Sequence, residues 1–140
     1  MRRATLRILA IVILLSMLLT TAAFAAITAS EYITATNTWI TRDGNTVKVN
    51  FSIIGTNMMD QIGVKKILLY EKNGNTWSLV ETYNYTDPLY AATMMGSSTS
   101  AKSGHVPYSG SASKDYYAKV TFYAEKDGGS DTIQQNTPIG

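Results

Sequence analysis

Few side chains in this sequence can carry out covalent chemistry. The chain has no cysteine and one histidine, His105, among 140 residues. Cysteine nucleophiles are therefore excluded, and a serine nucleophile would have only His105 as its base. A zinc site is excluded as well, because zinc needs several nitrogen or sulfur ligands. Since His105 follows the polar segment Lys102-Ser103-Gly104, we interpret it as a solvated side chain of a loop.

The ten carboxylates are the remaining chemical resource. Two acids held roughly 5 to 10 Å apart suffice for glycoside hydrolysis, so a small hydrolase is an alternative function. Asp43, Asp60, Asp127 and Asp131, however, all have a turn or a helix start as their simpler explanation. Asp127 and Asp131 offer oxygens to calcium, but the closely alternating acids of a dedicated calcium loop are missing. We therefore expect no catalytic residue, no metal and no cofactor.

Aromatic residues are the one surplus in the composition, with nine tyrosines and two tryptophans. Rings on a flat sheet face stack on sugar rings or anchor a protein partner. The candidate contact residues are Tyr70, Tyr117 and Tyr123 on strands, together with His105 and Tyr108 in a loop. The same rings have a structural alternative, which is to pair across strands and stiffen the sheet.

One stretch, from Asp115 to Glu125, shows the clearest strand period. Its predicted inward face consists of Tyr116, Ala118, Val120, Phe122 and Ala124. Its predicted outward face consists of Tyr117, Lys119, Thr121 and Tyr123. One apolar and one polar face are typical of a strand in a half-solvated antiparallel sheet.

Turn signals divide the rest of the chain into short strands. We predict strands over 31–41, 47–53, 64–72, 76–85, 90–97 and 131–137, with hairpin turns at Asp43-Gly44 and Asn73-Gly74. Residues 55–63 are predicted to cross between sheets through one helical turn, and residues 98–113 to form a long loop. The predicted core contains Val49, Phe51, Ile67, Trp77, Val120 and Phe122.

The fold class predicted from this pattern is all-β. About seven short strands with regular turns favour a single antiparallel β-sandwich over residues 31–140, of the immunoglobulin-like kind, with an open barrel as the alternative. Because the chain lacks cysteine, this domain is disulfide-free and must be held by its apolar core.

The first 25 residues read as a secretory signal peptide. A basic start precedes the apolar run Ile8 to Leu19 and the small-residue site Ala23-Phe24-Ala25, which predicts a leader helix and cleavage after Ala25. A retained membrane anchor is the alternative, but a spanning helix needs roughly 20 apolar residues and this run is shorter. We expect residues 26–30 to be a flexible tail, and the domain to be secreted outside the cell without membrane attachment.

The excess of positive charge belongs to the leader. The formal charge of the chain is +2, and the leader contains Arg2, Arg3 and Arg7, so residues 26–140 carry nine Lys and Arg against ten Asp and Glu. A near-neutral domain without a basic cluster in its sequence releases few counterions. Nucleic acid is therefore not expected as a partner.

Two resemblances support a sandwich. Tyr116-Tyr117-Ala118 resembles the tyrosine corner of immunoglobulin-like domains, with Ala118 at the position of the second cysteine of their intersheet disulfide. The segments Ile62-Gly-Val64, Asn73 to Trp77 and Tyr116 to Glu125 together are similar to short exported proteins of Gram-positive anaerobes that carry an uncharacterised β-sandwich domain. The second resemblance covers nearly the whole chain after the leader, and it implies no known activity.

The function expected from these features is recognition without catalysis. A secreted module would contact a glycan or a cell-envelope protein through Tyr70, Tyr117, Tyr123 and the loop 98–113, because Tyr, Ser and Gly combine rigid contact area with adaptable hydrogen bonding. One alternative is a structural extracellular subunit that self-associates through strand 131–137. The other is the two-carboxylate hydrolase.

Overall fold

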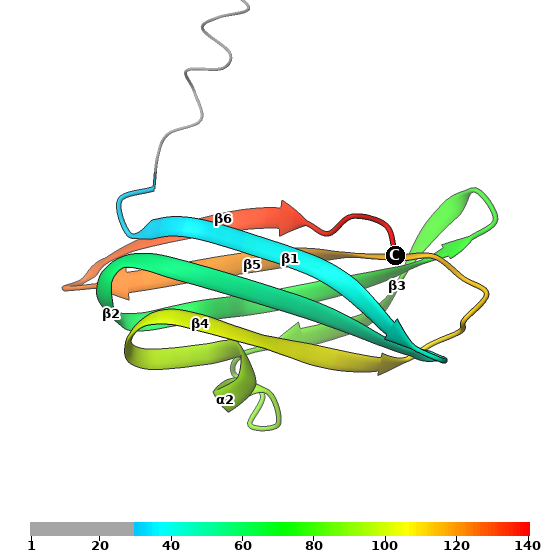
Figure 1. Cartoon of the computed structure of the whole chain (residues 1–140), viewed down its shortest axis with the longest axis horizontal. Coiled ribbons are helices and arrows are strands. Elements are labelled where there is room, and N and C mark those ends of the chain that lie inside the picture. Colours follow the sequence, from blue (N-terminus) through cyan, green and yellow to red (C-terminus); the bar gives the residue numbers. More distant parts are fainter. Residues whose placement is uncertain (1–29) are drawn as a thin grey trace, which may run out of the picture.

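Six strands and one short helix make up the described part of the chain (Figure 1). The computed structural model describes residues 30–140, so the predicted signal peptide and all but the last residue of the predicted tail lie outside the described residues. The strands are β1 (Ile33–Asp43), β2 (Thr46–Asn73), β3 (Thr76–Asn84), β4 (Met95–Ser109), β5 (Tyr116–Lys126) and β6 (Gly129–Asn136). All five strand pairings are antiparallel, so the all-β prediction is confirmed.

Strand β2 is the centre of the sheet. It runs without interruption for 28 residues. Its first half pairs with β1 on one side and β4 on the other, and its second half pairs with β5 and β3. The predicted crossover at 55–63 is wrong, because this segment stays in the sheet and buries Met59 and Ile62. A register shift between Ile54 and Met59 lets β2 bend there while it keeps its pairing with β4.

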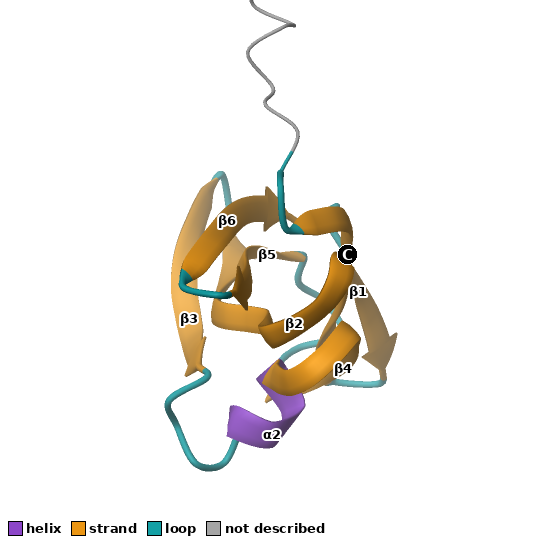
Figure 2. Ribbon diagram, turned by 90° about the vertical axis from the view of Figure 1, so that its left-hand side faces the viewer, coloured by secondary structure: helices purple, strands orange, loops and turns teal. Residues whose placement is uncertain are grey.

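The sheet curls until its two ends lie side by side. Strands β1 and β6 end the path β1-β2-β5-β6, and they run next to each other in the same direction in Figure 1. In the end-on view of Figure 2 the strands surround a common interior. No ladder joins β1 to β6 in residues 30–140, and side chains connect them instead. Thr36 Oγ1 donates to Gln135 Oε1 over 2.9 Å, and Asp131 accepts from Ser30 Oγ over 2.6 Å and from Tyr32 N over 2.8 Å.

The core lies inside this curl. The predicted inward face of β5 is confirmed, because all five of its residues have no exposed surface. Val49, Phe51 and Ile67 are buried as predicted. Trp77 is not, because the register places it opposite the exposed Lys72 on the outer face of the sheet. Tyr83 supplies the aromatic ring that β3 contributes to the core, and its hydroxyl donates to the Pro107 carbonyl over 2.7 Å.

The hairpin predictions are confirmed. β1 turns into β2 at Gly44 and β2 turns into β3 at Gly74, and both glycines have a positive φ, of 59° and 64°. This left-handed conformation is open to glycine without the steric cost of a side chain. The turns set the register in which Asp43 faces Thr46 and Asn73 faces Thr76.

The segment 90–113 differs from its prediction in two ways. Of the predicted strand 90–97 only residues 95–97 are strand, at the start of β4, while residues Ala91–Met94 form helix α2, whose turn is closed by Met94 N donating to Tyr90 O over 2.9 Å. In place of a loop at 98–113, β4 pairs with β2 as far as Ser109. Its many Ser and Gly side chains show no apolar alternation because only Val106 of β4 is buried. No helix in residues 30–140 has the length and apolar character needed to cross a membrane.

The strand count is six because the segments predicted as 47–53 and 64–72 are parts of one strand, β2. A single curled antiparallel sheet is therefore the observed architecture. The sandwich and immunoglobulin-like assignments stay predictions.

Candidate functional site

The predicted contact residues fall into separate parts of the molecule. Tyr70 and Tyr117 lie opposite each other on the outer face of β2 and β5. His105 is exposed on β4, opposite Asn50, in the other half of the sheet. Tyr108 packs against the core, with its ring edge-on to Tyr116 at a centroid distance of 6.0 Å. These residues do not form one site. Tyr70 and Tyr117 are the pair around which further aromatic and basic side chains gather.

Tyr70, Tyr117 and Trp77 form an aromatic cluster on the outside of the sheet. The rings of Tyr70 and Tyr117 are stacked, with centroids 4.9 Å apart and planes within 6°. Trp77 meets Tyr117 edge-on at 4.8 Å and 85°. Such offset and edge-on contacts are the favoured geometries of aromatic pairs. The cross-strand pairing considered as the structural alternative is therefore present, and it holds three rings in fixed positions at the surface.

The prediction that Trp77 lies in the core is wrong, although its outward position can be inferred from the hairpin. The Asn73-Gly74 turn pairs Asn73 with Thr76, which puts Trp77 opposite Lys72 on the same face. A lysine rarely points into a core, so its cross-strand partner must also point outward. The core prediction for Trp77 relies on its apolar character alone and does not use this register.

Tyr123 is predicted to contact a ligand, but in the structure its ring is covered. Its side chain is 9% exposed, and Lys65 Nζ lies 3.6 Å from the centre of its ring. The Tyr123 hydroxyl donates to Glu125 Oε2 over 2.7 Å. This hydrogen bond, together with burial, raises the pKa of the Tyr123 phenol. Lys65 and Glu125 thus close over a ring that alternation alone assigns to the solvent side.

Lysines surround the aromatic cluster. Lys72 Nζ lies 5.9 Å from the ring centre of Trp77, and Lys119 Nζ lies 5.5 Å from that of Tyr70. Leu79, opposite Tyr70 on β3, is 51% exposed. We call this surface the lysine–aromatic face, and it consists of the aromatic cluster, Leu79, Lys66, Lys72 and Lys119.

A polar cluster ties the connection before β5 to the sheet. The Tyr116 hydroxyl donates to Glu71 Oε2 over 2.6 Å, and Lys114 pairs with Glu71 Oε1 at 3.0 Å. The hydrogen bond from Tyr116, then that from Lys114, lowers the pKa of Glu71. Ser111 N donates to the same Tyr116 hydroxyl over 2.9 Å. Arg42 donates to the carbonyls of this connection at Ser111 and Lys114.

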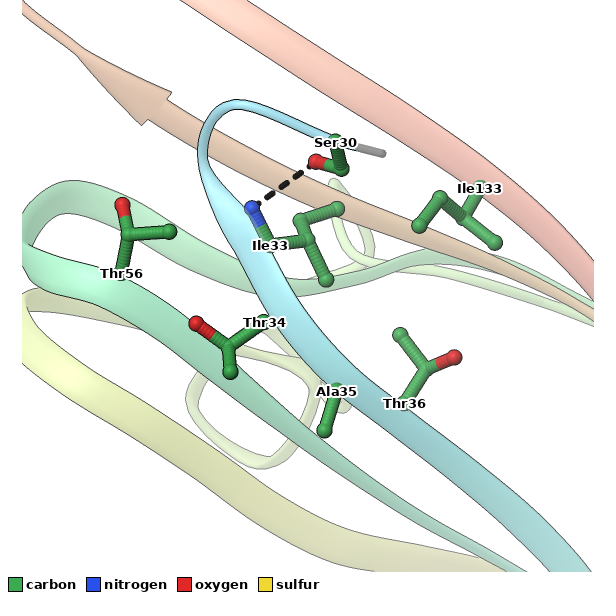
Figure 3. A pocket seen from close by; sticks show the side chains of 7 residues that line it. All are labelled: Ser30, Ile33, Thr34, Ala35, Thr36, Thr56 and Ile133. Carbon is green, nitrogen blue, oxygen red and sulfur yellow. Dashed lines mark hydrogen bonds between the residues drawn. The ribbon is translucent and has the colours of Figure 1, made fainter. Parts of the chain in front are cut away.

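Two depressions in the surface lie away from the aromatic cluster. The first, of about 410 Å³, lies between the start of β1 and β6 (Figure 3), where Ser30 Oγ accepts a hydrogen bond from Ile33 N. Its lining is made of hydroxyl and methyl groups, from Ser30, Ile33, Thr34, Ala35, Thr36, Thr56 and Ile133. The second is also about 410 Å³ and contains two carboxylates, Glu31 and Asp127, both on exposed residues.

Asp131 and Asp127, the two residues weighed as calcium ligands, have other roles. Asp131 is occupied by Ser30 and Tyr32, and the hydrogen bond from Ser30, followed by that from the Tyr32 amide, lowers the pKa of its carboxyl. Asp127 lies in the β5–β6 turn with its backbone amide bonded to Asp60 Oδ2 over 2.9 Å. Across residues 30–140, His, Cys, Asp and Glu side chains form no group of three that would hold a metal ion.

Comparisons with known proteins bring little similarity. No protein-family model and no curated protein matches the chain. Among solved structures, the chain resembles a hypothetical protein from Pyrococcus horikoshii OT3, with a TM-score of 0.34 and 19% sequence identity over 77% of this chain and 94% of that chain. A similarity this weak carries no argument about fold or function, so the function has to be inferred from this chain's own residues.

Proposed function

We propose that this protein is a secreted, non-catalytic recognition module that binds a glycan on its lysine–aromatic face. The observation that carries the proposal is the stacked pair Tyr70–Tyr117 with Trp77 edge-on beside it, outside the core. These rings contact one another across three strands and are not needed to fill the interior, which Tyr83 and Tyr116 fill from the same strands. An isolated domain gains little from holding these partly exposed rings outside its core.

The cluster has the properties of a prepared contact surface. Because the three rings hold one another in place, a ligand that binds them immobilises few additional side chains, which lowers the entropic cost of binding. Lys72 is an exposed side chain whose ammonium lies over the Trp77 ring. A ring that accepts an ammonium from solvent also accepts the C–H groups of a sugar once the flexible lysine moves aside. Leu79 adds apolar area next to the rings.

The environments of the carboxylates support a role without catalysis. Glu71, Glu125 and Asp131 are each occupied by side-chain hydrogen bonds that hold strands or connections together. Glu31 and Asp127 share a depression, but both residues are exposed. A general acid is normally desolvated so that its pKa rises toward the working pH. A hydrolase that used Glu31 and Asp127 would therefore have to work with two solvent-exposed carboxylates, without the desolvation that a general acid needs.

Self-association through strand 131–137 is the less favoured alternative. The edge of β6 that would accept a second copy faces β1, and Asp131 and Gln135 already bond to residues at or near β1. A covered edge is a poor template for another strand. We also retain the expectation that the domain is sandwich-like, is released after Ala25, and meets glycans or proteins of a cell envelope.

The test is a glycan-array screen with two single-tryptophan variants. We expect Trp77→Ala to abolish the binding shown by the parent. Trp39→Ala is the matched control, because Trp39 is 38% exposed on β1, away from the cluster, and its loss should leave binding unchanged. Absence of binding by the parent, or equal effects of the two variants, would refute the proposal.

A further inference from the structure

We propose that the glycan bound by the lysine–aromatic face is an anionic polysaccharide with negative charges on its repeating units. This inference rests on the proposed function and adds the chemical class of the ligand. The inference rests on an accumulation of unpaired positive charge on this face. The composition does not reveal it, because residues 26–140 carry nine basic and ten acidic side chains and are nearly neutral in total.

The lysines of this face have no acidic partner. In residues 30–140 the ion pair formed is Lys114–Glu71, and the side chains of Lys66, Lys72 and Lys119 make no hydrogen bond to another described residue. Lys102, Lys114 and Lys126, in contrast, each donate to a carbonyl or a carboxylate. The uncommitted ammonium groups are thus concentrated on the face that carries the rings.

Acids lie around this face and not in its middle. Asp115 lies beside Lys72 at one end, where the Lys72 amide donates to its carbonyl. Glu125 lies at the other end and is bonded to Tyr123. The side chain of Glu81 on β3 accepts a hydrogen bond from the backbone amide of the next residue, Thr82, over 2.9 Å. Between these acids the potential above the sheet is set by lysines, which attract a negatively charged ligand.

The spacing of the three lysines favours a polymeric ligand over a small anion. Lys66 and Lys72 are six residues apart on β2, which corresponds to about 20 Å along a strand. Lys119 lies between them, because its partner on β2 is Leu68. The three ammonium groups follow a track and do not converge on one point, so they match charges repeated along an extended chain better than a small anion.

The remaining side chains of the track favour a polysaccharide over a nucleic acid. Hydroxyl and amide groups lie beside the lysines, with Thr121 opposite Lys66 and Asn136 opposite Lys119. Such groups both donate and accept, as sugar hydroxyls do. Single-stranded nucleic acids need open ring faces on which bases stack. Tyr70 and Tyr117 stack on each other at 4.9 Å, so their facing sides are closed and fewer open ring faces remain for a run of stacked bases.

The test compares polygalacturonate with neutral dextran, using protein expressed from the full chain at 50 and 200 mM NaCl. We expect tighter binding of polygalacturonate, weakened on the order of tenfold by the added salt. The double variant Lys66→Gln/Lys119→Gln should lose about tenfold in affinity for polygalacturonate, since each lost charge contact weakens a salt-dependent complex. Lys48→Gln is the matched control, because Lys48 faces solvent between β1 and β4 and is equally free of described partners.

Each outcome separates this inference from the proposed function. Equal, salt-independent binding of dextran and polygalacturonate would overturn the anionic ligand and leave glycan recognition standing. Binding of neither polymer, in agreement with a negative glycan array, would remove both. Binding of single-stranded DNA as tightly as polygalacturonate, or an equal loss in Lys48→Gln, would show an unspecific attraction to polyanions and would also overturn the inference.

Discussion

Tyr116 on β5 donates its phenolic hydrogen to Glu71 Oε2 on β2 over 2.6 Å, and this bond joins the core to the connection before β5. The Tyr116 ring is fully buried, and the same hydroxyl accepts from Ser111 N. Gly110 lies so close that a Cβ there would be 2.5 Å from the hydroxyl. The Tyr116 side chain thus links β5 to the Glu71 carboxylate on β2 and to the backbone of the connection at Ser111.

Removing this hydroxyl should destabilise the domain. Tyr116→Phe keeps the ring but leaves Glu71 Oε2 and the Ser111 amide without the hydroxyl that they bond, and we expect a cost of about 1 to 3 kcal/mol. Chemical denaturation measures the change. Tyr85→Phe is the control and should stay within about 0.5 kcal/mol of the parent. A Tyr116→Phe variant as stable as the parent would contradict the structural role of the bond.

Stability should fall in acid because two carboxyl groups have lowered pKa values in the folded protein. Hydrogen bonds lower the pKa of Glu71, chiefly from Tyr116, and that of Asp131, chiefly from Ser30. A lowered folded pKa gives stability that is complete above the unfolded pKa, about 4 for such groups, and is lost as the pH falls through the folded value. We expect a constant Tm from pH 5 to 7 and a decline below about pH 4.

The matched variant for this pH profile is Glu71→Gln. Glutamine does not titrate, so the variant should melt lower than the parent at pH 7 and lose less Tm on acidification. Thermal melts followed by circular dichroism at several pH values provide the readout. Parallel profiles of the two proteins would show that Glu71 does not contribute to the acid dependence.

Phe122 and Trp77 should differ strongly in their contribution to stability. Phe122 has no exposed surface, so Phe122→Ala should cost about 3 to 5 kcal/mol, which approaches the whole stability of a small domain. Trp77 lies half-buried in the outer aromatic cluster, and Trp77→Ala should cost less, because an aromatic pair contributes about 0.5 to 1.5 kcal/mol. Urea unfolding of both variants tests the order, and the reverse order would mean that Trp77 belongs to the core.

Gly63 should not tolerate a side chain. It lies in β2 between Met95 of β4 and Tyr123 of β5, and a Cβ there would collide with the Met94 carbonyl. Overpacking against backbone costs about 1 to 3 kcal/mol, which is the loss expected for Gly63→Ala in thermal denaturation. Ser97→Ala, an exposed position of the same ladder, serves as the control and should melt like the parent.

Export should leave a shortened chain in the culture medium. The leader pattern predicts removal of residues 1–25, so intact-mass measurement on secreted material should give a protein that begins at Ala26. A chain recovered from membranes with Met1 to Ala25 still attached would show that the apolar run is an anchor.

Local chemistry in the sequence determines part of this fold. The inward face of β5 follows from strict alternation between Tyr116 and Ala124, and all of its members are buried. The hairpins at Gly44 and Gly74 follow from a backbone conformation that glycine adopts without cost. The candidate residues Tyr70 and Tyr117 follow from their position on outward faces, which a period of two residues defines.

Long-range pairing decided the rest. Residues 55–63 and 98–109 carry turn-like sequences, yet they are strands because β2 and β4 satisfy each other's backbone groups on both sides of the register shift between Ile54 and Met59. Trp77 lies outside because the β2–β3 register leaves the core position to Tyr83, and Tyr123 is covered because Lys65 reaches it from the neighbouring strand. The grouping of Lys66, Lys72 and Lys119 around three rings exists only in the curled sheet, since it depends on which strands become neighbours, and no local period in the chain contains that information.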